Sequence, residues 1–135
     1  MGVFLSVCIP AYNRAEVLPV LLDSVLAQNY DDYEIVICED KSPEREAIKA
    51  IIADYTASHA DRICYFENEK NLGYDGNIRN LIEKSSGEYC FFMGNDDLMA
   101  PGALQTVASA LERHENVGWI LRSYAAFDGG PENIT

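Results

Sequence analysis

The chain has 135 residues, of which 48% are hydrophobic and 24% charged, a composition typical of a folded domain and not of a disordered, collagen-like or coiled-coil chain. Ten basic residues stand against 22 acidic ones, which gives a formal net charge of −12. That charge repels nucleic acids and anionic membrane surfaces, so we expect no nucleic-acid partner. A phosphorylated ligand would need local devices, such as backbone NH groups, a helix N-terminus or a bound cation.

In the first half of the chain, apolar strands alternate with amphipathic helices. We predict strands over residues 4–9 and 34–38 and helices over 17–26 and 43–55. Asn13 is the expected cap of the first helix, because Glu16 follows three residues later in a capping-box pattern. Ser42 is the expected cap of the second helix, with Pro43 at its first position.

The second half continues the alternation. We predict strands over residues 62–66, 88–93 and 117–121 and helices over 78–82 and 101–111. Gly87 suits a helix stop, and residues 124–135 show no clear element. The alternation predicts an α/β fold with a mostly parallel sheet and helices on both faces, and strands this apolar should be buried on both sides.

The four cysteines point to a reducing compartment. Cys8, Cys38, Cys64 and Cys90 each lie in or beside an apolar strand, and none forms a CxxC pair. We therefore expect small buried thiols in the cytoplasm, with neither a zinc site nor a redox motif.

Polar residues gather where the predicted strands end. Four successive loops carry them, over residues 10–14, 39–42, 68–77 and 95–97. In an open parallel sheet, ligands bind beyond the carboxyl ends of the strands, so these loops form the candidate site. No Gly-x-Gly-x-x-Gly follows the first strand and no Walker A sequence is present, which disfavours a dehydrogenase-type or P-loop site.

Adjacent carboxylates are the sharpest feature of these loops. Asp96 and Asp97 repel each other unless a cation or hydrogen bonds compensate, and Mg²⁺ or Mn²⁺ is the natural partner. The alternative is a solvated turn that caps the following helix. Glu39 and Asp40 could accept hydrogen bonds from a base or ribose or only solvate their loop, and Tyr12 could stack on a base or pack locally.

Taken together, these motifs resemble a family 2 glycosyltransferase of the Rossmann-like GT-A fold. The resemblance covers residues 4–122 and rests on segments 6–14, 21–28, 34–42, 71–73, 87–89, 94–97 and 101–104. The resemblance implies a nucleotide site formed by Pro10, Ala11, Tyr12, Asn13, Glu39, Asp40, Asn71, Gly73, Asn77 and Asp96, with Asp97 as the ligand of Mn²⁺ or Mg²⁺.

The same resemblance implies individual roles. Residues 10–12 would line the base pocket, and Asp40 would accept a hydrogen bond from the base, with Glu39 beside it. Asp96 would lie near the ribose, and Asp97 would bind the cation that bridges the diphosphate.

Several residues depart from the family pattern. Glu39 replaces the first Asp of the usual turn, and Lys41 replaces its Gly. Asn95 stands where many members carry another Asp. Arg79 lies one place later than the family arginine and receives no phosphate role, whereas Asn77 matches a variant among bacterial surface-glycan transferases.

The resemblance also implies that residues 1–135 are one GT-A domain truncated before its acceptor-binding half. The parent enzyme would transfer a sugar from a nucleoside diphosphate, with UDP expected, to an acceptor in glycan biosynthesis, with inversion. We expect the parent in the cytoplasm or on the cytoplasmic face of a membrane. We expect this chain alone to be inactive, since neither Asp128 nor Glu132 lies in a recognisable base motif.

Three alternatives stay open. The chain could be a non-catalytic nucleotide-binding module, or a self-association module whose uncovered sheet edge forms homo-oligomers. A nucleotidyltransferase could share the sheet and a metal-binding carboxylate. The opening at residues 10–13 disfavours the last, because pyrophosphorylases usually begin with a glycine-rich basic loop.

Overall fold

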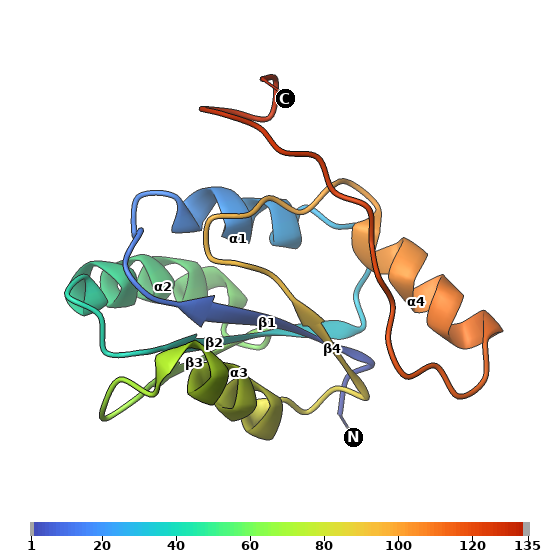
Figure 1. The fold of residues 1–135 in the computed structure, drawn as a ribbon, viewed down its shortest axis with the longest axis horizontal. Coiled ribbons are helices and arrows are strands. Elements are labelled where there is room, and N and C mark those ends of the chain that lie inside the picture. Colours follow the sequence, from blue (N-terminus) through green and yellow to red (C-terminus); the bar gives the residue numbers. More distant parts are fainter. Residues whose placement is uncertain (1, 134–135) are drawn as a thin grey trace.

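A four-stranded parallel sheet in the order β3-β2-β1-β4 forms the centre of the chain (Figure 1). The structure, a computed structural model, describes residues 2–133. Its strands are β1 (Leu5–Ala11), β2 (Tyr33–Glu39), β3 (Ile63–Glu67) and β4 (Tyr89–Phe92), and its helices are α1 (Leu18–Leu26), α2 (Arg45–His59), α3 (Gly73–Lys84) and α4 (Ala103–Arg113). The predicted alternation of strands and helices is confirmed up to α4.

Strands β1 and β2 are the most deeply buried part of the sheet. They pair along seven positions, from Leu5 opposite Tyr33 to Ala11 opposite Glu39, and β4 pairs with the other side of β1. Because β1 and β2 end level with each other, the loops that follow them begin at the same height along the sheet edge.

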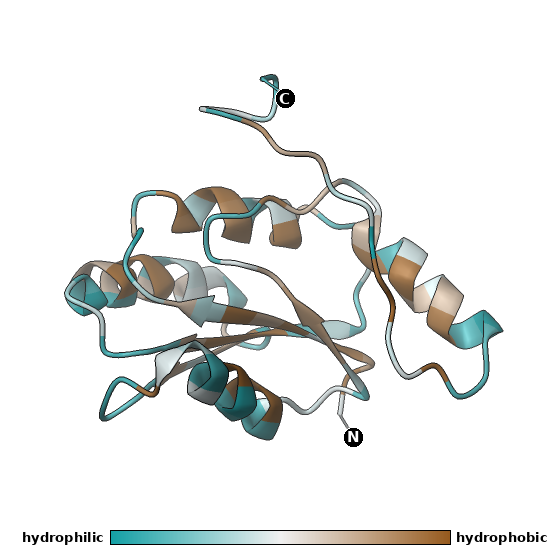
Figure 2. Cartoon of the chain, viewed as in Figure 1, coloured by the Kyte–Doolittle hydropathy of each residue, from teal (hydrophilic) through white to brown (hydrophobic). Residues whose placement is uncertain are grey.

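Helices cover both faces of the sheet, as predicted. Figure 1 shows α1 and α2 on one side and α3 on the other. The larger core includes Val7, Ile9, Ile35 and Ile37 from the strands and Leu22, Ile48 and Leu104 from α1, α2 and α4. The smaller core, beneath α3, is formed by Cys8, Val36, Cys38 and Leu81. Figure 2 shows the strands between these helices as mostly hydrophobic, with hydrophilic stretches towards the strand ends.

The cysteines are free, as expected, and all lie in the described range: Cys8 and Cys38 are buried, whereas Cys64 and Cys90 are partly exposed. Among residues 2–133, no helix is both long and apolar enough to cross a membrane.

Both predicted helix caps are wrong. Val17 is the N-cap of α1, and Asn13 lies in the preceding turn with a φ of 54°, so Asn13 and Glu16 form no capping box. Glu44 is the N-cap of helix α2, and the NH of Ser42 donates instead to Glu39 Oε1 at 2.7 Å. In both cases the loop uses several residues to leave the sheet edge before the helix can begin.

The fifth strand, predicted over residues 117–121, is also wrong. The segment runs beside β4 without pairing with it, and a groove of about 760 Å³ lies between the two. Arg122 bridges the groove, since it donates to the carbonyl oxygen of Phe92 at 3.3 Å and its guanidinium lies 4.0 Å from the centre of the Phe91 ring. Trp119 and Leu121 stay mostly exposed, so the apolar run over residues 117–121 does not mark a buried strand.

Gly87 serves a close approach between chain segments. Helix α3 already ends at Lys84, and Gly87 lies where the chain passes beside β1. Its NH donates to Ser6 Oγ at 2.8 Å, and a Cβ at this position would lie 2.6 Å from that oxygen and 2.7 Å from the Ser6 nitrogen. No side chain fits there without displacing β1.

We expect Gly87→Ala to lower the free energy of unfolding by about 1–3 kcal/mol, the usual cost of overpacking. Urea denaturation followed by circular dichroism measures the change. Gly118→Ala is the matched control, because a Cβ there meets no atom within 4 Å, and it should change stability by less than about 0.5 kcal/mol. Equal effects of the two substitutions would contradict the steric account.

Candidate functional site

Backbone hydrogen bonds continue past the strand ends and align the loops of the candidate site. The NH of Asp40 donates to the carbonyl oxygen of Ala11 at 3.0 Å, and the NH of Asn68 donates to that of Glu39 at 2.9 Å. The loops after β1, β2 and β3 therefore leave one edge of the sheet side by side.

The loop after β1 is held by side chains from two other loops. Asn95 Nδ2 donates to the carbonyl oxygens of Tyr12, at 3.3 Å, and Asn13, at 3.0 Å. The Glu44 carboxylate accepts hydrogen bonds from the NH groups of Arg14, at 2.9 Å, and Ala15, at 3.3 Å. These contacts hold two consecutive residues, Asn13 and Arg14, at positive φ.

This clamped loop presents one predicted residue clearly to solvent. Tyr12 is 46% exposed, whereas the side chain of Ala11 is buried in the larger core and Pro10 is partly buried. Asn13 Oδ1 is buried and finds no hydrogen-bond partner within residues 2–133. Of the predicted residues in this loop, Tyr12 alone offers a large surface to a ligand.

Glu39 is a buried carboxylate whose oxygens are already occupied. It accepts hydrogen bonds from the NH groups of Lys41, at 3.0 Å, and Ser42, at 2.7 Å, and from Arg45 Nε. Burial disfavours its charge, but the hydrogen bonds from Ser42 and Arg45 outweigh burial and hold the pKa of Glu39 below its ordinary value. Glu39 thus stabilises the turn in which Lys41 adopts a φ of 54°.

Asp40 is 96% buried, and its two carboxylate oxygens have different surroundings. Its Oδ1 accepts hydrogen bonds from Asn68 Nδ2 at 2.9 Å and from the NH of Leu72 at 2.7 Å. Its Oδ2 accepts none from the part of the chain that the structure describes. Asn71 Nδ2 donates to the Asp40 carbonyl oxygen at 3.0 Å, which brings the loop after β3 against this residue.

Asn77 and Gly73 lie at the start of α3. Asn77 is 98% buried, its Nδ2 donates to the Cys38 carbonyl oxygen at 3.0 Å, and its Oδ1 accepts from Asn68 at 2.8 Å. The NH of Gly73 donates to Asn71 Oδ1 at 2.9 Å. Gly73 is the first residue of α3 and has a φ of 75°, in the left-handed region. The side chain of Asn77 is therefore committed to internal contacts, whereas Asn71 and Gly73 stay exposed at the loop surface.

Asp96 and Asp97 are exposed beyond the end of β4. Asp96 Oδ2 lies 3.0 Å from Arg14 Nη1, and Asp97 Oδ2 accepts from the NH of Gly94 at 3.1 Å. Helix α4 is capped by Gly102 without a side-chain hydrogen bond from any described residue, so the Asp pair does not cap that helix.

The carboxylate of Asp97 fits a divalent cation that also binds substrate oxygens. Within the described residues, no three acidic, histidine or cysteine side chains converge as a complete metal site. Mg²⁺ and Mn²⁺ are held in many proteins by one or two carboxylates together with water and substrate phosphates. One exposed hard-oxygen ligand at this edge meets that need.

Sequence reasoning assigned no individual role to the residues that support the site, although it placed Asn68 in a candidate loop. Asn68, Asn80, Glu44 and Arg45 all hold loop residues in place. The available signal was the position of Asn68 directly after a strand and the spacing of Asn77 and Asn80, which places both on one face of α3.

This parallel sheet, with its polar loops at one edge, is the architecture of the GT-A glycosyltransferases. The model of the family "Glycosyl transferase family 2" matches residues 6–134, and the chain belongs to that family. The resemblance inferred from the sequence is confirmed.

Several curated bacterial proteins are similar in sequence. The abequosyltransferase RfbV of Salmonella typhimurium is 30% identical over 113 residues, which cover 84% of this chain and 34% of that protein. A Campylobacter jejuni protein, the GalNAc(5)-diNAcBac-PP-undecaprenol beta-1,3-glucosyltransferase, is 34% identical over 104 residues, 76% of this chain and 33% of that one. The chain thus spans about a third of the length of these two relatives.

Solved structures show the same fold. Residues 1–349 of S. aureus TarS in complex with UDP align with a TM-score of 0.72 and 25% identity, over 82% of this chain and 32% of that one. The mannosyltransferase PcManGT of Pyrobaculum calidifontis, in complex with GDP-Man and Mn²⁺, aligns with a TM-score of 0.75 and 19% identity, over 87% and 34%.

Glu39→Gln should lower the free energy of unfolding at pH 7 by about 2–3 kcal/mol, because hydrogen bonds to a charged group are lost. The pKa of Glu39 is lowered on folding, so its contribution is complete above the unfolded value of about 4.3 and disappears as the pH falls through the folded value. The gap between wild type and variant should therefore close below about pH 4.

Denaturant titrations between pH 3 and pH 8 measure that gap. Glu67→Gln is the control, since Glu67 is partly exposed and pairs with Lys49 and Arg45 at 3.2 Å, and it should cost less than about 1 kcal/mol. A gap for Glu39→Gln that stays constant down to pH 3 would show that its ionisation does not stabilise the fold.

Proposed function

We propose that this chain is the donor-binding part of a bacterial glycosyltransferase, which binds a nucleoside-diphosphate sugar together with Mn²⁺ or Mg²⁺. In the longer parent protein, the sugar is transferred with inversion to an acceptor in glycan or glycoconjugate biosynthesis. The observation that carries the proposal is the joining of three loops by hydrogen bonds, which brings Tyr12, Asp40 and the Asp96–Asp97 pair to one sheet edge.

The residues divide into contact and support roles. Tyr12 stacks on the base, the buried Ala11 and the partly buried Pro10 hold Tyr12 in place from beneath, and the Oδ2 of Asp40 accepts a hydrogen bond from the base. Asp96 lies near the ribose. Supporting residues that shape these loops are Asn13, Glu39, Asn71, Gly73 and Asn77.

Asp97 is the proposed ligand of the divalent cation. When bound, the cation supplies positive charge that stabilises the diphosphate leaving group. The chain's own part is to hold that carboxylate at the end of β4, through the NH of Gly94, with Arg14 balancing the neighbouring Asp96. We propose UDP as the nucleotide and the cytoplasm as the location, where free thiols persist.

Asp97→Ala should weaken UDP binding in the presence of Mn²⁺ by at least about tenfold, because a charged ligand of the cation is lost. Isothermal titration calorimetry with UDP, GDP, CDP and dTDP, each with and without Mn²⁺, measures this effect. Asp54→Ala removes an equal charge from an exposed site on α2 and should leave the affinity unchanged. Binding that ignores both Mn²⁺ and Asp97 would contradict the metal assignment.

The main alternative is a self-association module. The high exposure of Trp119, Leu121 and Tyr124 beside the groove along β4 favours it. Light scattering on the same samples separates the two functions: a monomer that binds UDP supports the proposal, and a stable oligomer that binds no nucleotide supports the alternative.

A further inference from the structure

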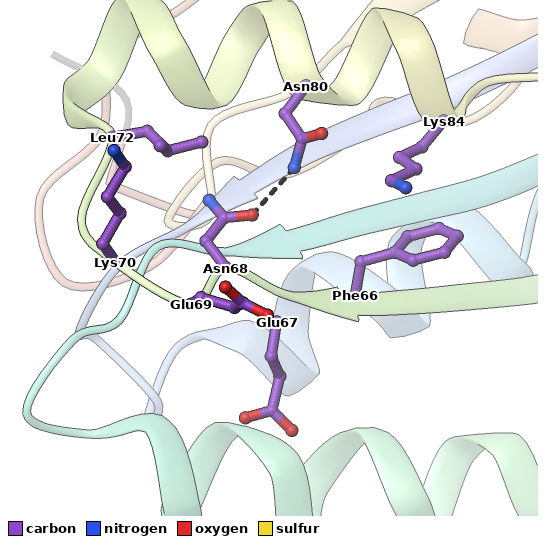
Figure 3. A pocket seen from close by; sticks show the side chains of 8 residues that line it. All are labelled: Phe66, Glu67, Asn68, Glu69, Lys70, Leu72, Asn80 and Lys84. Atoms are coloured by element: carbon purple, nitrogen blue, oxygen red, sulfur yellow. Dashed lines mark hydrogen bonds between the residues drawn. The ribbon is translucent and has the colours of Figure 1, made fainter.

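Three asparagines form a hydrogen-bonded network next to Asp40. Within it, a directed path, here called the relay, runs from Asn80 through Asn68 to Asp40. Asn80 Nδ2 donates to Asn68 Oδ1 at 2.8 Å, as the dashed line in Figure 3 shows, and Asn68 Nδ2 donates to Asp40 Oδ1 at 2.9 Å. Asn68 Nδ2 also donates to Asn77 Oδ1 at 2.8 Å. Asp40, Asn68 and Asn77 are each at least 94% buried.

The direction of the relay is fixed by a backbone carbonyl, which can only accept. Asn77 Nδ2 donates to the carbonyl oxygen of Cys38, so Asn77 must turn its oxygen toward Asn68. Asn68 must then turn its Nδ2 toward both Asn77 and Asp40, and its own oxygen toward Asn80. Each amide therefore has one orientation that satisfies its neighbours.

The consequence for Asp40 is a carboxylate with one oxygen occupied by donors. Asn68 and the NH of Leu72 both donate to Oδ1, which fixes the rotation of the carboxylate and leaves Oδ2 to accept from a ligand. A buried side chain held in this way is preorganised, so it loses little conformational freedom when a ligand binds.

Building on the proposed function, we propose that Asn68 is a positioning residue for base recognition. Asn77 fixes the orientation of the Asn68 amide, and Asn80 lies outside the base contact and only satisfies Asn68 Oδ1. Through Asp40, this relay favours nucleobases that present a ring N–H donor, as uracil does. Asn68 and Asn80 do not touch the diphosphate in this scheme, so their effect is confined to the base.

The surroundings of Asn80 allow a test without collapse of the core. Asn80 and Asn68 line an open hollow of about 590 Å³, together with Phe66, Lys84 and others (Figure 3). Water from this hollow can replace the amide of Asn80 when the side chain is shortened. A carboxylate at the same position would instead set an acceptor against Asn68 Oδ1 and force the Asn68 amide to turn around.

Asn80→Asp should therefore weaken UDP binding in Mn²⁺ by about tenfold or more, with inorganic pyrophosphate affinity changed less than about twofold. Asn80→Ala should change UDP affinity by less than about threefold. Calorimetry with UDP and with pyrophosphate measures both, and the melting temperature of each variant verifies folding. The pyrophosphate titration also controls for the added negative charge, because that charge would lower the affinity for UDP and for pyrophosphate equally.

The outcomes separate the relay from the proposed function. Loss of UDP binding alone in Asn80→Asp supports the relay. Equal weakening of UDP and pyrophosphate, or equal effects of Asn80→Asp and Asn80→Ala, would overturn it while the proposed function stands. A wild-type chain that binds no UDP with Mn²⁺ would overturn the proposed function and the relay together.

Discussion

The buried carboxylate of Glu39 is the contact on which the rest of the site depends. It terminates β2 and gathers two backbone NH groups and the guanidinium of Arg45. Arg45 in turn donates to the carbonyl oxygen of Asn68 at 2.6 Å, which fastens the loop after β3 to the loop after β2. Because a charge without partners is costly in an apolar interior, this arrangement can form only when all these groups are in place together.

That cooperativity explains why two neighbouring acidic residues serve different ends. Both carboxylate oxygens of Glu39 accept hydrogen bonds from the protein. Asp40, one residue later, contacts the next loop through Oδ1 only, and its Oδ2 accepts no hydrogen bond from the described residues. The positive φ of Lys41 marks the sharp turn between them and the helix that follows. A glycine would meet this turn without strain, so the hydrogen bonds of Glu39 compensate for the side chain at this position.

At the sheet edge, part of the net charge of −12 is offset by ion pairs with nearby arginines. Arg45 balances Glu39 and Glu67, and Arg14 balances Asp96, so the carboxylates nearest the proposed donor are partly neutralised by cations from the same loops. Asp97 and Arg122 both line the groove along β4, so a third cation shares a surface with the acidic pair, and burial lowers the pKa of Arg122 while Asp97 opposes that decrease. Under the proposed function, this local balance is what lets an acidic chain accept a diphosphate.

Sequence reasoning predicted the features that depend on local pattern and missed those that depend on partners. The strands β1 to β4 followed from apolar runs, and the position of the candidate site, which stays a prediction, followed from the rule that parallel strands end at one edge. The hydrogen bond between Asn68 and Asn80 left only the spacing of Asn77 and Asn80 as a signal, because Asn68 lies in the loop after β3 and Asn80 on α3, and the two become neighbours only after folding. Residues 117–121 are the converse case, in which the local pattern predicted a strand that has no pairing partner among the described residues. Their hydrophobicity suits a strand, but a strand exists only where a neighbour accepts its hydrogen bonds, and here the Arg122 side chain bridges a groove that no backbone ladder closes.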